Sequence, residues 1–434
     1  MATSTTTNGS HSAEKKEIVI IGGGIIGATT AYFLTRHPAY SPSTHSITIL
    51  EATGIASGAS GKAGGLLALW AYPSSLVPLS FKLHKELAKE HDGANRWGYR
   101  ALGVGQIECV GRKIGDSNVE GKGEEVKGVH DVNVGGGATG DGNVSLQKRS
   151  KDSYKRLQKM GLPDDLDWVS ADAARGYEAM GSEKDTAQVH PYQFTTAMVE
   201  LAKEKGAKVI IGRCTALDTT SKTVTYTSSS PGQPDTETRT IEATDIILTT
   251  GAWTPTILPS VPIGHTRAHS VVITPSRPVS AYALFTSISL PRDYKQNHKS
   301  RPMHVTPEIY ARPFNSVYAC GEGDHLVPLP ATTADVEVDD SRCQDVIDYV
   351  STISDELRDG KVEARQACYL PIVESGGGPL VGPTGHDGVW LAAGHTCWGI
   401  QNGPGTGKIM SEFVMDGKVT SAKNIGGLDP RRVL

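Results

Sequence analysis

The sequence lacks an apolar run of the ~18 residues that a membrane-spanning helix needs, so we expect no membrane span. Its six cysteines form no Cys-x-x-Cys pair, which argues against structural zinc and against a disulfide scaffold. The net charge is only −4, with no basic tail or stripe to support nucleic-acid binding. We therefore expect neither a metal nor a nucleic-acid partner, and 434 residues suffice for two domains.

Targeting signals are also missing from the two ends of the sequence. Residues 1–16 are rich in serine and threonine, without an apolar segment or an arginine, so they resemble neither a secretory signal nor a good mitochondrial presequence. We expect this lead to be disordered. The last three residues are not the peroxisomal address Ser-Lys-Leu, which leaves the cytoplasm as the expected location.

Residues 17–51 carry the pattern on which the other predictions depend. A β-branched apolar strand is followed by Gly22, Gly24 and Gly27 in the spacing Gly-x-Gly-x-x-Gly. A segment of small residues with helical spacing comes next, and a second apolar strand ends in Glu51. A glycine-rich turn without a ligand is the alternative, but the order strand, helix, strand and acid favours a dinucleotide-binding βαβ unit.

Each part of this unit has a physical task. Gly22 permits the tight turn, Gly24 lets a pyrophosphate approach the backbone, and Gly27 lets helix and strand pack closely. The helix N-terminus offers unpaired N–H groups to the phosphates. Glu51 can accept hydrogen bonds from ribose hydroxyls and would repel a 2′-phosphate, which argues against NADP.

The segment after Glu51 distinguishes FAD from NAD. Residues 52–65 form a long run of small and hydroxyl-bearing residues, where an NAD domain usually continues into a helix. Here the chain resembles the D-amino-acid-oxidase-like superfamily of FAD enzymes, which includes glycine oxidase and sarcosine oxidase. The resemblance implies FAD, with its ADP half on the glycines and Glu51 and its ring near residues 57–65.

The C-terminal part carries the second strong pattern. A strand at residues 388–393 leads through the glycine-rich residues 394–407 into a helix at residues 408–415. Bare N–H groups at such a helix start suit the pyrimidine side of a flavin, where negative charge collects on reduction. The resemblance is close here and covers nearly the whole chain except residues 1–16 and 113–148.

The remaining elements follow from periodicity and turn residues. Residues 113–148 predict a long surface insertion without function, because they are rich in glycine and polar residues. Expected helices are 76–91, 153–160, 170–175, 194–205 and 340–351. Expected strands are 105–110, 209–211, 223–227, 238–243, 245–253, 269–274, 282–286, 309–312 and 316–320.

These elements predict an α/β fold with two domains. A Rossmann-like FAD-binding domain comprises residues 17–100, 165–263 and 363–434. An inserted α+β substrate domain with an antiparallel sheet comprises residues 101–164 and 264–362.

The resemblance also implies a reaction. Members oxidise the C–N bond of an amine or amino-acid-like substrate by hydride transfer to flavin, usually with molecular oxygen as acceptor and hydrogen peroxide as product. Two alternatives stay open. One is an FAD dehydrogenase with another electron acceptor, and the other is a flavin-bound trafficking or assembly protein with little turnover.

The substrate anchors of the family are not where the resemblance places them. Leu370 stands where glycine oxidase-like relatives have an arginine, and Gln401 where sarcosine oxidase-like relatives have a lysine. Arg267, Arg312 and Arg365 are candidate replacements, although an ordinary ion-pair or surface role is favoured for each. A simple α-amino acid is therefore in doubt, and a neutral or bulkier amine becomes a plausible small-molecule substrate.

Four further residues are singled out. Cys368 falls where the sarcosine oxidase branch attaches its flavin covalently, although a buried core cysteine is the favoured interpretation. His395 could hydrogen-bond flavin or substrate, with a structural role as the alternative. His265 and His269 could place a positive charge near the flavin.

Two sets of site residues summarise these predictions. The candidate catalytic residues are His395, Gln401, His269 and Arg312. The candidate FAD-binding residues are Gly22, Gly24, Ile25, Ile26, Gly27, Glu51, Ala52, Ser57, Ser60, Gly61, Lys62, Ala63, Gly64, Gly65, Leu66, Gly251, Trp253, Cys368, Gly394, His395, Gly399, Ile400, Gln401, Asn402 and Gly403.

Overall fold

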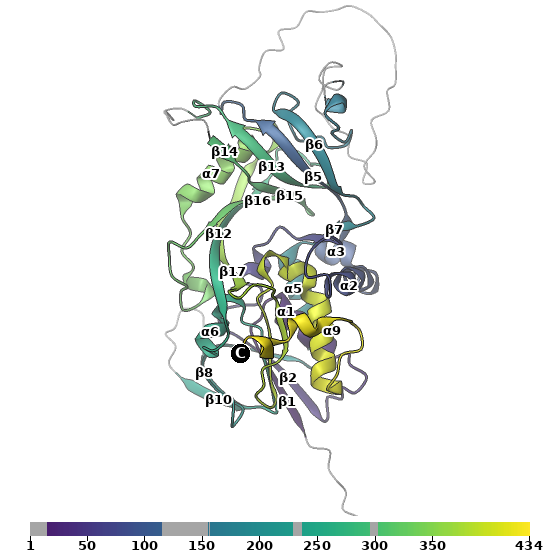
Figure 1. Ribbon diagram of the computed structural model, residues 1–434, viewed down its shortest axis with the longest axis vertical. Helices are drawn as coiled ribbons and strands as arrows, with labels where there is room; N and C mark the ends of the chain where they lie inside the picture. Colours follow the sequence, from purple (N-terminus) through teal and green to yellow (C-terminus); the bar gives the residue numbers. More distant parts are fainter. Residues whose placement is uncertain (1–14, 115–154, 156, 229–236, 296–302) are drawn as a thin grey trace, which may run out of the picture.

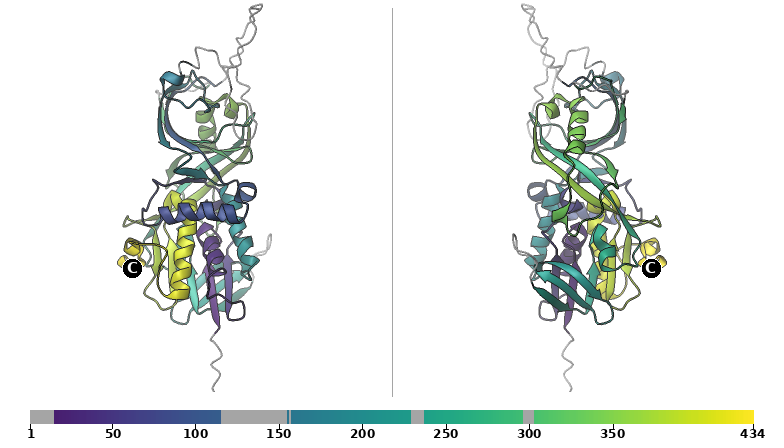
Figure 2. Two further views of the ribbon diagram at one scale, coloured as in Figure 1. Left: turned by 90° about the vertical axis from the view of Figure 1, so that its right-hand side faces the viewer. Right: turned by 90° about the vertical axis from the view of Figure 1, so that its left-hand side faces the viewer.

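The computed structural model is elongated, with helices packed on a lower sheet and a strongly curved upper sheet (Figure 1; Figure 2). It describes residues 15–114, 155, 157–228, 237–295 and 303–434. Most of the predicted lead (1–16) and insertion (113–148), and part of the predicted helix 153–160, lie outside these described residues.

The lower sheet is built around the predicted βαβ unit. Strand β1 (Lys16–Ile21) lies between β2 (His45–Glu51) and β11 (Asp245–Leu248) and runs parallel to both. The parallel part extends to β8 and β19, while the outer strands pair antiparallel. In spatial order the strands are β10 (Thr238–Glu242), β9 (Thr223–Ser228), β8 (Lys208–Asp218), β2, β1, β11, β19 (Val389–Ala393) and β18 (Leu380–Pro383).

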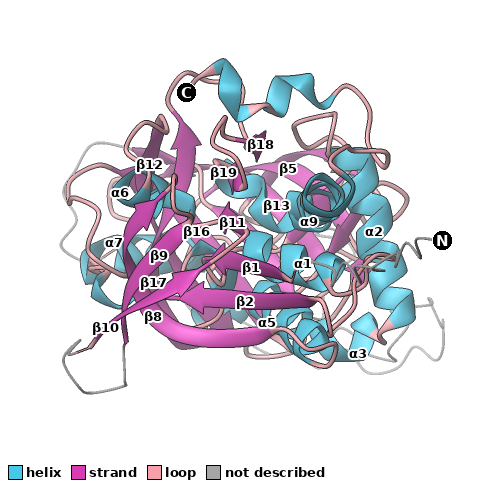
Figure 3. Ribbon diagram, turned by 90° about the horizontal axis from the view of Figure 1, so that it is seen from below, coloured by secondary structure: helices cyan, strands magenta, loops and turns pink. Residues whose placement is uncertain are grey.

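Helix α1 (Ile25–Leu34) is buried on nearly every side. It packs against α9 (Gly399–Asp416) and α5 (Pro191–Lys203), and Figure 3 shows α1 and α9 beside the sheet. The Thr29 hydroxyl of α1 donates to the carbonyl of Gly403 in α9 over 2.8 Å. Further α-helices in the described part of the chain include α2 (Val77–Glu90), α3 (Gly93–Trp97), α6 (Thr254–Ile257), α7 (Asp340–Ser351) and α8 (Asp355–Arg358).

The upper sheet is mostly antiparallel, with one parallel pair between β5 and β13. Helix α7 packs against β12 and β16 and has the bounds that the sequence predicts. In spatial order the strands are β17 (Lys361–Val373), β12 (Ile263–Thr274), β16 (Ser316–Asp324), β15 (Glu308–Arg312), β13 (Tyr282–Leu290), β5 (Gly103–Val110) and β6 (Ala174–Gly181), and β14 (Met303–Val305) pairs with β13.

A small third sheet contains segments adjoining both parts of the molecule. In it β7 (Thr186–Gln188) pairs antiparallel with β3 (Leu66–Ala68) and with β4 (Arg100–Ala101). Strand β3 continues from the predicted flavin loop, and β4 precedes β5 of the upper sheet. The small sheet therefore connects the loop of the lower unit to the upper unit.

The predicted helix at residues 170–175 is wrong. The Ser170 carbonyl oxygen accepts hydrogen bonds from the N–H groups of Ala173 and Ala174, and these bonds form a single turn. Strand β6 begins at Ala174 and pairs antiparallel with β5. Tertiary strand pairing thus overrides the local N-cap pattern.

The predicted domain division stays a prediction, and two strands cross it. Strands β6 and β17 fall in segments assigned to the FAD-binding domain, yet both pair within the upper sheet. In the part of the chain that the structure describes, no helix has both the length and the apolar character to cross a membrane.

Candidate active site

A cavity of about 460 Å³ lies at the carboxyl edge of the parallel strands. Its lining comes from the ends of β1, β2, β11 and β19, and from the middle of β8. The loop after β2, residues 329–333 and residues 369–371 also contribute to it. In open α/β sheets this edge is where ligands bind, so the cavity is the candidate active site.

The turn between β1 and α1 forms one end of the cavity. Gly22 has a φ of +111°, and Gly24 is the N-cap of α1 without a side chain to cap the helix. A Cβ added at Gly24 would meet only the Ser60 side chain, 3.1 Å away. The backbone here is thus open to the cavity, and the N-terminus of α1 gives the site the positive end of a helix dipole.

Glu51 is held firmly beside this turn. One carboxylate oxygen accepts the N–H of Gly23 over 2.7 Å, and the other accepts the N–H of Thr53 over 3.0 Å. The side chain lies at the end of β2 and lines the cavity. Both oxygens retain further lone pairs, so the acid can also accept hydrogen bonds from a ligand.

Another part of the cavity lining is formed by the glycine-rich segment before and at the start of α9. Gly394, His395, Gly399 and Ile400 line it. His395 is buried, its Nε2 lies 3.0 Å from the Thr406 hydroxyl, and burial lowers its pKa to about 3. The ring is therefore neutral at physiological pH and offers a hydrogen bond instead of a charge.

Most predicted FAD-binding residues lie together in this lining. They are Gly22, Gly24, Ile25, Ile26, Glu51, Ala52, Ser57, Ser60, Ala63, Gly251, Trp253, Gly394, His395, Gly399 and Ile400. The predicted residues outside the lining are Gly27, Gly61, Lys62, Gly64, Gly65, Leu66, Cys368, Gln401, Asn402 and Gly403.

Gln401 and Asn402 are buried in α9 and help to hold the surrounding backbone. The Gln401 side-chain oxygen accepts the N–H of Ala68 over 2.7 Å, and the Asn402 amide donates to the Tyr72 carbonyl over 2.8 Å. Both side chains thus fix the segment that follows the flavin loop. Their predicted contacts with flavin or substrate stay predictions.

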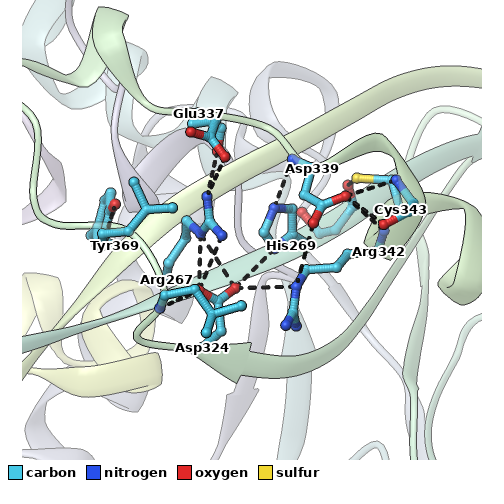
Figure 4. Close-up of polar contacts among 12 residues, drawn as sticks. Arg267, His269, Asp324, Glu337, Asp339, Arg342, Cys343 and Tyr369 are labelled. Carbon is cyan, nitrogen blue, oxygen red and sulfur yellow. Dashed lines mark hydrogen bonds and ion pairs between the residues drawn. The ribbon is translucent and has the colours of Figure 1, made fainter.

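The predicted candidates Arg267 and His269 belong to a buried ion network (Figure 4). Arg267 Nη2 lies 3.1 Å from an Asp324 carboxylate oxygen, and Arg267 Nη1 lies 3.3 Å from Glu337. His269 Nε2 accepts the N–H of Asp339 over 3.0 Å, while its Nδ1 faces Asp324 at 3.6 Å. Burial and the charge of Arg267 lower the pKa of His269. Neither Arg267 nor His269 lines the cavity.

The other two candidate arginines also lie outside the cavity lining. Arg312 is buried at the end of β15, where it donates to the Ala63 carbonyl over 3.3 Å and to the Ser316 hydroxyl over 2.9 Å. Burial lowers its pKa to about 10. Arg365 donates to the Asp340 carbonyl and to the Gln344 side chain of α7. Arg312 thus ties the flavin loop to the upper sheet.

Cys368 is buried and does not line the cavity. Burial raises the pKa of its thiol to about 11, although the charge of Lys62 acts in the opposite direction. Covalent attachment requires the thiolate, which burial disfavours. We expect acid precipitation to leave all flavin in the supernatant. A yellow pellet whose colour Cys368→Ala released would contradict this prediction.

Some lining residues were absent from the predicted site. Residues 212–215 continue β8 beyond the predicted strand, and they line the cavity because β8 runs parallel to β2, with Ile211 opposite Glu51. That parallel pairing is a signal that could have identified them. Residues 329–333 reach the cavity from the end of β16, where Thr333 hydrogen-bonds Ser57 over 2.7 Å. No local pattern marks this contact.

The lining suits an extended dinucleotide. It combines the backbone at Gly24, a helix N-terminus whose Ile25 N–H is bound by the Ser60 hydroxyl, an anchored acid and a second glycine-rich helix start. The fold and the site together define a flavoprotein oxidoreductase of the dinucleotide-binding class. A model of the DAO family, described as FAD dependent oxidoreductase, matches residues 17–413. The chain belongs to this family, and its cofactor is FAD.

Similar proteins agree with this assignment. The Saccharomyces cerevisiae protein named "Putative oxidoreductase TDA3" is 37% identical, with 94% of this chain and 92% of that protein covered. The Schizosaccharomyces pombe protein named "Putative oxidoreductase C1F5.03c" is 36% identical, with 94% and 95% covered.

Solved structures show the same fold. Glycine oxidase from Geobacillus kaustophilus has a TM-score of 0.64 at 18% identity, covering 97% of this chain and 100% of that one. L-proline dehydrogenase from P. horikoshii also has a TM-score of 0.64, at 17% identity, covering 96% and 98%. The predicted fold class of a Rossmann-like FAD-binding unit with a substrate sheet is confirmed.

Proposed function

We propose that this FAD-dependent oxidoreductase oxidises the C–N bond of an amine, with molecular oxygen as the electron acceptor. The observation that carries the proposal is one cavity that joins the phosphate-binding turn to the glycine-rich start of α9. In this arrangement Gly22, Gly24 and Glu51 hold the ADP half of FAD. Gly394 to Ile400 hold the ring, which supplies the hydride acceptor when FAD is bound.

The protein contributes orientation and electrostatics. Backbone N–H groups at the start of α9 favour the negative charge that the ring region gains on reduction. His395 is neutral, because burial lowers its pKa to about 3. It can therefore contribute a hydrogen bond but no positive charge to the ring region. The substrate amine loses a proton before hydride transfer, because its lone pair must form the new C=N bond.

The side chains around the ring end favour an amine over an amino acid. Leu370 lines the cavity where an arginine would hold a carboxylate in the resembled glycine oxidases. The guanidinium of Arg267 is already paired with Asp324 and Glu337. A substrate carboxylate would therefore lack a bidentate partner among these residues.

The test is anaerobic mixing of the FAD-loaded protein with matched pairs of amines and amino acids that differ only by a carboxylate. We expect amines to bleach the visible flavin band and the paired amino acids to do so poorly. Admitting oxygen should restore the band with one peroxide per turnover. Restoration only by an added dye would indicate a dehydrogenase. A flavin that no amine reduces would contradict the proposal and favour the trafficking or assembly alternative.

A further inference from the structure

Six aromatic side chains gather where the upper sheet meets the C-terminal glycine segment. Trp70 contacts Trp398 with ring centroids 5.5 Å apart and Phe285 at 6.3 Å. The ring centroids of Phe285 and Tyr310 are 6.3 Å apart, and those of Tyr310 and Tyr318 are 5.7 Å apart. The cluster, which we call the aromatic cluster, consists of Trp70, Tyr72, Phe285, Tyr310, Tyr318 and Trp398.

The aromatic cluster reaches from solvent to the flavin loop. Trp70 is 39% exposed and Tyr72 is 53% exposed, so the outer end is open to solvent. At the inner end the Tyr310 ring lies against Gly64, where an added Cβ would be 2.8 Å from the ring. Its neighbour Ala63 lines the FAD cavity. The cluster therefore forms an aromatic path toward the expected position of the flavin ring.

The carboxylate of Glu308 in β15 lies beside the Tyr310 ring, and Glu308 pairs with Phe285 of β13. The Tyr310 hydroxyl donates to one oxygen of Glu308, and the Cys320 thiol lies 3.9 Å from the same oxygen. Within the described residues its side-chain partners are Tyr310 and Cys320, neither of which carries a positive charge. Its charge also raises the pKa of Cys397, after the larger effect of burial, and Cys397 lines the cavity.

We propose that Glu308 and the aromatic cluster bind the ammonium group of the substrate, and that this substrate is a cationic amine without a carboxylate. This inference rests on the proposed amine oxidation. Ring faces attract cations within about 6 Å, and a carboxylate without a cationic partner completes such a site. A substrate carboxylate would meet the like charge of Glu308, which opposes binding.

Glu308 also has the right chemistry to prepare the amine. The ammonium transfers one proton to the free oxygen of Glu308, leaving the nitrogen lone pair. That lone pair forms the C=N bond while the C–H bond breaks, and FAD, when bound, would supply the acceptor for the hydride that leaves. The product iminium keeps one positive charge, and Glu308 later releases its proton to water. Burial raises the pKa of Glu308, which makes its carboxylate a better proton acceptor.

The experiment measures binding to the oxidised, FAD-loaded protein without turnover. Choline is the probe, because its quaternary nitrogen has no lone pair with which to form a C=N bond. Its uncharged isostere 3,3-dimethylbutan-1-ol and its carboxylate analogue betaine are the comparison ligands. Intrinsic fluorescence follows binding, since Trp70 and Trp398 lie in the cluster. We expect choline to bind at least about tenfold more tightly than either comparison ligand.

Variants assign the effect to Glu308. Glu308→Gln should bring choline affinity to the level of the isostere, whereas Glu322→Gln, an exposed acid on β16, should change nothing. Trp70→Leu removes an exposed ring and should weaken choline binding several-fold, which gives a second test if Glu308→Gln misfolds. Equal binding of choline and its isostere, tighter binding of betaine, or full affinity in Glu308→Gln would each overturn the inference.

Failure of this inference is distinct from failure of the proposed function. Choline binding that depends on Glu308, in a protein whose flavin no amine reduces, would contradict the proposed oxidation and retain the cation site. Amine-dependent bleaching that is unchanged in Glu308→Gln would retain the oxidation and overturn the cation site.

Discussion

Replacing Gly27 with alanine is expected to yield protein that retains no FAD. A Cβ at this position would lie 2.0 Å from the Gly22 carbonyl oxygen and 2.8 Å from the Thr249 hydroxyl. Backbone atoms of a tight turn cannot move away cheaply, so α1 must shift and carry the phosphate-binding turn with it. We expect a destabilisation of about 3 kcal/mol, at the upper end of the usual cost of overpacking. The flavin-to-protein absorbance ratio and the thermal unfolding midpoint measure both effects.

Gly54→Ala is the matched control for this substitution. Gly54 lies in the loop beside Glu51, and a Cβ added there would meet no atom within 4 Å. This variant should keep its flavin content and its unfolding midpoint. Equal flavin loss in both variants, or full flavin content in Gly27→Ala, would show that the close approach at Gly27 is not what limits FAD binding.

Replacing Glu51 with alanine has the second largest expected effect. The change removes the acceptor of the Gly23 and Thr53 N–H groups and the proposed acceptor of the ribose hydroxyls. Hydrogen bonds to charged groups contribute about 1.5–3 kcal/mol each. Loss of one such contact to FAD weakens binding by about tenfold to a hundredfold. Titrating the flavin-depleted protein with FAD, followed by flavin fluorescence, measures the dissociation constant.

Two further variants separate the role of Glu51 from a general effect of charge. Glu51→Gln keeps one acceptor oxygen and should fall between the wild type and Glu51→Ala. Glu242→Gln removes an exposed acid at the end of β10, away from the cavity, and should bind FAD normally. An unchanged dissociation constant in Glu51→Ala would contradict the proposed ribose contact.

The FAD-binding unit could be predicted because its signals are local in sequence. The turn at Gly22, the acid Glu51 and the glycine-rich residues 394–407 each carry a recognisable pattern, although α9 begins at Gly399 and not at the predicted residue 408. Helix α7 was predicted with correct bounds, since Asp339 caps it and its apolar positions repeat with helical spacing. The pattern at Ser170 had the same kind of cap, but pairing with β5 decided the outcome.

The proposed substrate site could not be predicted, because only the folded sheets assemble it. Trp70 follows β3, Phe285 lies in β13, Glu308 in β15 and Trp398 just before α9. No spacing in the sequence connects these residues. The ion pair of Arg267 could be favoured from the sequence but its partner could not be named, because only the pairing of β12 with β16 places Asp324 beside it.

The order of strands in the lower sheet sets when FAD can bind during synthesis. The phosphate-binding turn after β1 leaves the ribosome early. However, β1 lacks one of its two neighbouring strands until β11, which begins at Asp245, has been synthesised. The last residues of the cavity lining, which end with Gly399 and Ile400 of α9, leave the ribosome late. A ligand stabilises only the state that binds it. FAD therefore stabilises the nearly complete chain, and a nascent chain that ends before α9 gains no such protection.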